Sequence, residues 1–168
     1  NALVDEDIIR ALYAASKAGV KVKLNVRGIC CLRPGLKGVS DNIEVVSIVD
    51  RYLEHSRIYH FWNGGDEEHY IASADWMPRN LDRRIELMTH VTSKDAVERL
   101  SAVLDGMFDD NQKARVLDSE GAYHRRRPGK GEEPFRVQTR LYEDAKSRAD
   151  RLRAVPLTLE PIKRDSQS

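Results

Sequence analysis

The hydrophobic positions near the start of the chain follow first a helical and then a strand spacing. In residues 5–18, Ile8 and Leu12 lie on one helical face, and the acidic residues at the beginning of the segment suit the positive end of a helix dipole. Gly19 provides a stop, and residues 20–26 then alternate apolar and basic side chains as strands do. A helix followed by glycine and a strand predicts the second half of an α/β unit.

Apolar, β-branched runs predict a further group of strands. These strands lie at residues 43–49, 58–62, 70–74 and 84–91, with a tight hairpin turn at residues 63–66. The run at 58–62 is continuous enough to predict a buried strand. Between the first two strands, glycine and proline mark residues 28–40 as a loop that is rich in basic side chains.

The second half of the chain is predicted to be mainly helical. A helix capped by Thr92 or Ser93 runs to about residue 108, an extended pair surrounds Gly121, and a charged helix spans about residues 134–152. We expect residues 1–152 to form one domain and residues 153–168 a flexible tail. Because the chain starts at Asn1 directly before a helix, we interpret it as a piece of a longer protein.

Composition restricts the class of protein. The chain has 168 residues, 40% apolar and 33% charged, as expected for one folded domain with its own core. A net charge of +1 does not indicate a nucleic-acid-binding protein, and no apolar run is long enough to span a membrane. Adjacent Cys30 and Cys31 are read as reduced thiols, which favours a cytoplasmic location, with peripheral association at a membrane as an alternative.

The stretch at residues 51–57 carries the strongest chemical signal. His55 lies between Arg51 and Arg57, just before the predicted buried strand. Guanidinium groups match phosphate oxygens in charge and geometry, and histidine exchanges a proton near neutral pH. This pattern is typical of a phosphate site. The alternative reading is a structural histidine at a strand edge.

Other basic residues are weaker candidates. Arg27 follows a predicted strand and precedes a glycine, where α/β sheets place ligand-binding loops, although its position alone favours a solvated surface arginine. The triple arginine at 125–127 indicates either a solvated face or a polyanion-binding surface. No spacing among the remaining histidines suggests a metal site, and no P-loop glycine motif occurs.

Four long motifs resemble the C-terminal part of the bacterial polyphosphate kinase family, which builds inorganic polyphosphate from ATP. They are VRGICCLRPG (26–35), SDNI (40–43), IVDRYLEHSR (48–57) and SADWMPRN (73–80). The resemblance covers about residues 1–135. It implies an α/β fold of the phospholipase-D-like type, with a mixed sheet flanked by helices, and places the chain in the second of two such domains.

The resemblance also implies roles for individual residues. The phosphorylated histidine of the family belongs to the first phospholipase-D-like domain, outside this chain, whereas His55 matches a nucleotide-site histidine that assists transfer as an acid. Arg27 matches a nucleotide-contacting arginine. Arg57 is a candidate phosphate contact because it flanks His55, not because of the resemblance. The implied ligands are ATP or ADP with Mg²⁺, and inorganic polyphosphate. The implied partners are the remaining domains of the same enzyme and further copies of it.

Two alternatives remain open. The isolated chain could be a nucleotide- or polyphosphate-binding module without catalytic activity. It could also belong to a phospholipase-D-like phosphodiesterase, but Arg57 stands where the His-x-Lys motif of those enzymes has lysine.

Overall fold

Helix α1 and strand β1 form the α/β unit that the hydrophobic pattern predicts. The computed structural model describes residues 1–153, and in it α1 spans Glu6–Lys17 and β1 spans Val22–Asn25. The Asp5 carboxylate caps the helix by accepting a hydrogen bond from the Ile8 N–H at 3.0 Å. Gly19 has a φ of +88°, a left-handed conformation that glycine adopts without steric cost. Both predicted elements are confirmed, although the strand is shorter than expected.

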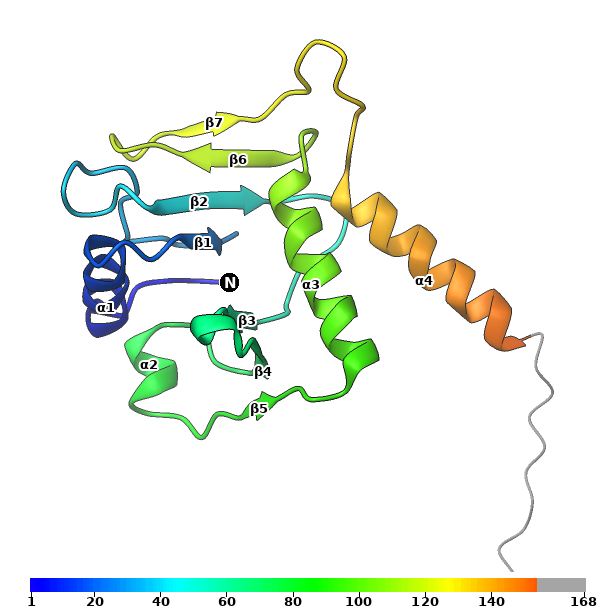
Figure 1. The fold of residues 1–168 in the computed structure, drawn as a ribbon, viewed down its shortest axis with the longest axis horizontal. Helices are drawn as coiled ribbons and strands as arrows, with labels where there is room; N and C mark the ends of the chain where they lie inside the picture. The colour runs from blue at the N-terminus through cyan, green and yellow to red at the C-terminus, as the bar shows by residue number, and fades with distance from the viewer. Residues whose placement is uncertain (154–168) are drawn as a thin grey trace, which may run out of the picture.

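A four-stranded mixed sheet forms the centre of the domain (Figure 1). Its order is β1-β2-β6-β7, with β1 parallel to β2 and the other pairs antiparallel; β2 spans Ile43–Ile48, β6 Ala114–Leu117 and β7 Tyr123–Arg125. Val45 packs in the cluster beneath α1, whereas Ile48 packs with Met107 and Val137 from the two long helices. Both faces of β2 are therefore covered, as its apolar sequence predicts.

The other strands form a separate three-stranded antiparallel sheet, β3-β4-β5. Strand β3 spans Ile58–Phe61, β4 Glu68–Ala72 and β5 Met88–His90, and a 3₁₀ turn, η1, spans Asn63–Gly65. The prediction of a strand over 84–91 is wrong for its first half. Before β5 the Glu86 carboxylate is held by the side chains of Ser73 and Asn80, so side-chain bonds replace a strand ladder there.

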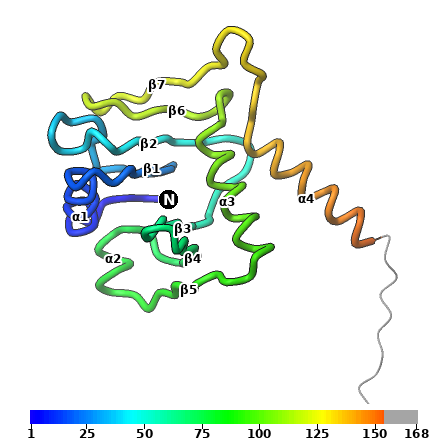
Figure 2. Tube along the Cα trace, in the orientation of Figure 1, coloured from blue at the N-terminus to red at the C-terminus, as the bar shows by residue number. Residues whose placement is uncertain are grey.

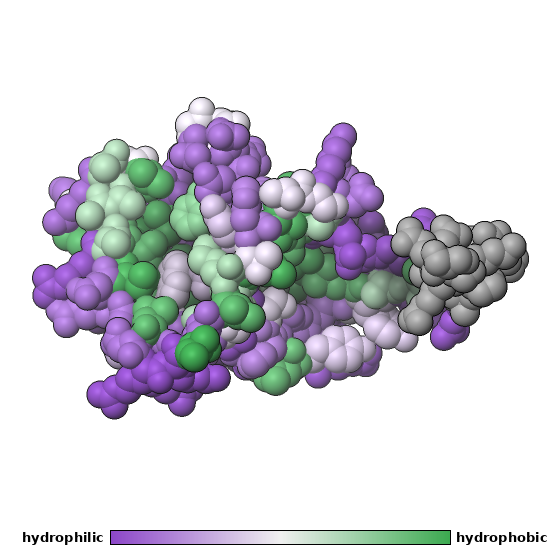
Figure 3. All heavy atoms as spheres, turned by 90° about the horizontal axis from the view of Figure 1, so that it is seen from below, coloured by the Kyte–Doolittle hydropathy of each residue, from purple (hydrophilic) through white to green (hydrophobic). Residues whose placement is uncertain are grey.

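The prediction that residues 58–62 are buried is also wrong. Phe61 is 49% exposed and Trp62 is 65% exposed. Helix α3 (Lys94–Asp109) contacts β3 from one side, but residues on the neighbouring strands, such as Ile71 and Met88, are also open to solvent. Seen from below, apolar residues lie among polar ones on the visible face of the molecule (Figure 3). A continuous apolar run thus belongs here to a small sheet covered on one side.

The N-terminal segment connects the two sheets. Leu3, 1% exposed, donates its N–H to the Ile29 carbonyl at 2.8 Å, and Val4 donates to the Trp76 carbonyl at 2.8 Å. The chain start accordingly lies between β1 and the β3–β4 hairpin (Figure 1). Backbone pairing on both sides places the end of β1 close to Asp75, which follows β4.

Two long helices complete the domain. Helix α3 spans Lys94–Asp109 and α4 spans Val137–Arg153, while α2 is a short helix at Pro78–Leu81. The two long helices meet closely at Gly106. A Cβ added there would lie only 3.1 Å from a methyl carbon of Val137. From that contact α4 extends away from the sheets (Figure 2). No helix among residues 1–153 is both long and apolar enough to span a membrane.

The predictions for the second half are largely confirmed. The helix expected after Ser93 corresponds to α3, the extended pair to β6 and β7, and the charged helix to α4. Gly121, between the paired strands, has a φ of +86°. The predicted tail lies outside the described residues apart from Arg153, the last residue of α4.

Candidate active site

The site candidates lie at the edge of the central sheet where the parallel strands β1 and β2 end. The carboxyl ends of parallel strands face the same way, so the segments that follow them become neighbours. Arg27 follows β1, and the segment 49–57 leads from β2 to β3. The Nε–H of Arg27 donates to the Glu54 carbonyl oxygen at 2.5 Å. The arginine is thereby fixed beside the residue that precedes His55.

His55 and Arg57 are also in direct contact. One terminal nitrogen of Arg57 donates to the His55 carbonyl oxygen at 3.0 Å and lies 3.3 Å from His55 Nδ1. His55 itself is exposed to solvent. Because a guanidinium group only donates, this contact suits an imidazole that accepts at Nδ1. The three residues singled out in the sequence thus lie together in one cluster.

An acidic residue balances part of this charge. Arg57 Nε lies 3.0 Å from Asp75 Oδ1, and both side chains are largely buried. Burial raises the pKa of Asp75, but the hydrogen bond and the charge of Arg57 outweigh it, so the pKa lies below its usual value. Arg27, in contrast, makes no ion pair within residues 1–153. Its charge is available to an external anion.

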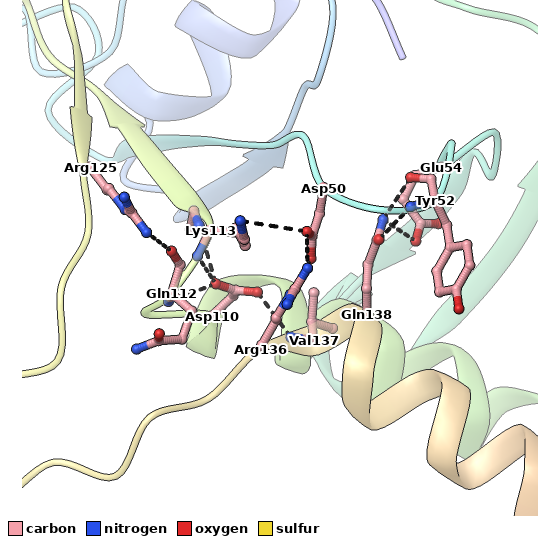
Figure 4. A network of polar contacts seen from close by, with 11 residues as sticks. Asp50, Tyr52, Glu54, Asp110, Gln112, Lys113, Arg125, Arg136, Val137 and Gln138 are labelled. Carbon is pink, nitrogen blue, oxygen red and sulfur yellow. Dashed lines mark hydrogen bonds and ion pairs between the residues drawn. The ribbon is translucent and has the colours of Figure 1, made fainter.

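A second set of polar contacts, which the sequence did not reveal, holds the segment before His55 (Figure 4). The Arg136 guanidinium donates to both carboxylate oxygens of Asp50, at 2.7 and 2.5 Å, and this hydrogen bonding lowers the pKa of Asp50. The Gln138 amide accepts from the Tyr52 N–H at 2.7 Å and donates to the Tyr52 carbonyl at 2.8 Å and to Glu54 at 3.1 Å. The first turn of α4 therefore fixes the backbone that leads to His55.

Asp110 in turn fixes the start of α4. This fully buried carboxylate follows α3 and accepts the Val137 N–H at 2.9 Å with one oxygen. Its other oxygen accepts three backbone N–H groups, those of Gln112, Lys113 and Ala114. A carboxylate that satisfies four donors needs no cationic partner. The feature of these contacts that was visible in the sequence is Gln138, a glutamine in the first turn of a predicted helix.

The other basic candidates do not join this cluster. Arg33 donates to the Glu120 carbonyl at 2.8 Å. Arg125 donates to the Gln112 carbonyl at 3.0 Å, and Arg126 pairs with Glu44 at 2.9 Å. Two of the three arginines, Arg125 and Arg126, therefore make intramolecular contacts at the β7 edge, and the reading of a simple solvated face is incomplete.

Comparison with known proteins identifies the family of the chain. The family profile described as "Polyphosphate kinase C-terminal domain 2" matches residues 1–138. The chain belongs to the polyphosphate kinase family. A polyphosphate kinase of Rhodopirellula baltica is 58% identical over 142 residues, and one of Pseudomonas aeruginosa is 52% identical over 143 residues. These alignments cover 84% and 85% of this chain.

A solved polyphosphate kinase has the same domain fold. The crystal structure of polyphosphate kinase from Porphyromonas gingivalis superposes with a TM-score of 0.84 at 43% identity, over 90% of this chain and 23% of that chain. The phospholipase-D-like α/β fold expected from the motifs is thus confirmed. The chain spans 17% and 21% of the length of the R. baltica and P. aeruginosa kinases.

The described residues around His55, Arg27 and Arg57 do not fit a Mg²⁺ site that the protein itself would hold. Magnesium prefers several oxygen ligands in an octahedral arrangement. Asp75 is already bound by Arg57, and Glu54 by Gln138, whereas the groups nearest His55 are guanidinium nitrogens. We therefore assign no step to a magnesium ion held by these residues.

Proposed function

We propose that this chain is the second C-terminal catalytic domain of a polyphosphate kinase. The enzyme would transfer the terminal phosphate of ATP to inorganic polyphosphate, reversibly, through a phosphohistidine on another domain. Residues 1–152 would form the catalytic domain. Membership of the family and the grouping of His55, Arg27 and Arg57 at one sheet edge support this proposal.

Phosphoryl transfer depends mainly on positioning and charge neutralisation. Arg27, which has no acidic partner in the described chain, would bind the nucleotide phosphates. Arg57, bound to Asp75, would present its remaining N–H groups beside His55. Together they would hold negatively charged oxygens next to the imidazole.

His55 would act as the acid. With Nδ1 beside Arg57, Nε2–H would donate a hydrogen bond to the transferring or leaving oxygen, or a proton once the imidazole is protonated. Its exposure supports a composite site, in which another domain of the enzyme brings the phosphohistidine and the nucleotide. The remaining domains, and further copies of the enzyme, are the proposed partners.

Substitution in the complete enzyme tests these roles. We expect His55→Ala to lower kcat for polyphosphate synthesis by roughly 10²–10⁴-fold, the usual contribution of a positioned acid. Arg27→Ala should mainly raise KM for ATP. Arg10→Ala is the matched control, since Arg10 is an exposed arginine of α1 paired with Glu6. Near-normal turnover in both site variants would reject the assignment.

A second function remains possible for the chain on its own, because it spans only about a fifth of the length of its relatives. It could bind nucleotide or polyphosphate without catalysing transfer. Calorimetry of the chain with ATP and with polyphosphate, at two salt concentrations, separates these cases. Salt-sensitive binding of polyphosphate without nucleotide binding would favour the module.

A further inference from the structure

The β3–β4 hairpin brings two histidines and a glutamate together. His60 and His69 are directly opposite each other in the strand register, and their rings stack with centroids 4.4 Å apart. Glu67 precedes β4, and its carboxylate lies 3.2 Å from His60 Nε2. One ligand atom from each of the three residues lies within 4.8 Å of the other two. None of these residues contributes to the cluster around His55.

His69 is the unusual member of the group. It is 1% exposed, and its Nε2 lies 2.9 Å from the Ser101 hydroxyl of α3. Its Nδ1 is buried and has no hydrogen-bond partner. An unpartnered buried nitrogen is costly, and such groups usually have a specific role.

We propose that His60, Glu67 and His69 form a binding site for a divalent transition-metal ion, with Zn²⁺ as the best match. Imidazole and carboxylate are ordinary zinc ligands, whereas magnesium prefers an all-oxygen shell. The Ser101 hydroxyl would accept a hydrogen bond from the Nε2–H of His69, which leaves Nδ1 free to coordinate the ion. Water would complete the tetrahedral shell.

The geometry indicates how the site would close. Zinc–nitrogen distances of about 2.0–2.1 Å place tetrahedral ligand atoms roughly 3.3 Å apart. The 4.8 Å spread therefore has to contract, and the stacked rings have to turn their lone pairs toward a common point. His60 and Glu67 are 37% and 44% exposed, so they are free to rotate toward the fixed His69.

The ion would have a structural role. Strand β3 begins directly after Arg57, and Ser101 belongs to α3. A metal bound by His60, Glu67 and His69 would join both strands of the hairpin and, through Ser101, the helix that packs on it. The hairpin would then be held by coordination in addition to its backbone ladder.

Cobalt and zinc titration of the complete enzyme, first stripped by a chelator, tests the site. Wild-type enzyme should give the visible absorption of low-coordinate Co²⁺, and added Zn²⁺ should displace the cobalt and abolish this absorption. Wild-type enzyme should also bind one more ion than His60→Gln or Glu67→Gln enzyme. Ser101→Ala should weaken zinc binding about 10–100-fold, as is typical of a group that orients a ligand. His90→Gln is the matched control, because His90 is an exposed histidine on the next strand of the same sheet.

Two outcomes would overturn the proposal. One is equal zinc stoichiometry in wild-type, His60→Gln and Glu67→Gln enzymes, since these exposed substitutions should not disturb folding. The other is a loss of the cobalt spectrum in His90→Gln that matches the loss in His60→Gln. Either result would leave the three residues as a stacked histidine pair with an ion pair.

Discussion

The Arg136 guanidinium donates to both carboxylate oxygens of Asp50, at 2.7 and 2.5 Å, across 86 residues of sequence. It joins the start of α4 to the end of β2, where the chain turns toward His55. Asp50 is nearly inaccessible, with a side chain that is 2% exposed, and Lys113 lies 3.8 Å away. This ion pair connects the last long helix to the candidate active site.

Removing this pair should destabilise the domain. Arg136→Ala leaves Lys113, 3.8 Å away, as the remaining cationic partner of the Asp50 carboxylate, so we expect the melting temperature of the chain to fall by roughly 5 °C. Arg140→Ala is the matched control, because Arg140 is an exposed arginine of α4 that pairs with Asp144 at 3.3 Å. Calorimetry of both variants provides the measurement, and equal melting temperatures would contradict the prediction.

The same pair predicts a dependence of stability on pH. Hydrogen bonding to Arg136 lowers the pKa of Asp50 in the folded state. The stabilisation is therefore present above the ordinary aspartate value of about 3.9 and is lost as the pH falls through the lower folded value. Urea unfolding of wild type and Asp50→Asn across this range should show a stability difference that shrinks with acidification. A difference independent of pH would argue against it.

Gln138 should act as a positioning residue for His55. It makes three hydrogen bonds to Tyr52 and Glu54, and it lies in the first turn of α4. We expect Gln138→Ala to lower kcat of the complete enzyme about tenfold while KM for ATP changes little, because the imidazole would be misplaced. Gln138→Glu keeps the acceptor for the Tyr52 N–H and should recover part of the loss. A change in melting temperature without a change in kcat would assign it a purely structural role.

Arg57 and Arg27 should differ in their effect on stability. Arg57→Ala leaves the buried Asp75 carboxylate without its guanidinium partner and should cost about 2 kcal/mol. Arg27→Ala removes a hydrogen bond to a backbone carbonyl and should cost less than about 1 kcal/mol. Urea denaturation of the two variants compares them directly. The reverse order would show that the Arg57–Asp75 pair contributes little to folding.

Much of the secondary structure could be predicted from local patterns. The helices α1 and α3 have apolar residues at helical spacing and a cap residue before their first turn, and the strand β2 is an apolar, β-branched run. The errors fall in the small sheet. The segment before β5 has strand-like residues, but the ladder to β4 ends at Ala72 and Met88, and beyond them only one backbone hydrogen bond, from Ser73 to Leu87, follows. The exposure of β3 depended on what covers it, which its own sequence does not contain.

Local patterns were enough to predict most of the elements, the family and the segment that carries His55, because periodicity and long motifs are local properties of the chain. Which groups meet became known from the folded arrangement alone. The parallel pairing of β1 with β2 brought Arg27 to Glu54, and the hairpin register placed His60 opposite His69. Such contacts depend on strand register and on packing between distant elements, so no local pattern specifies them.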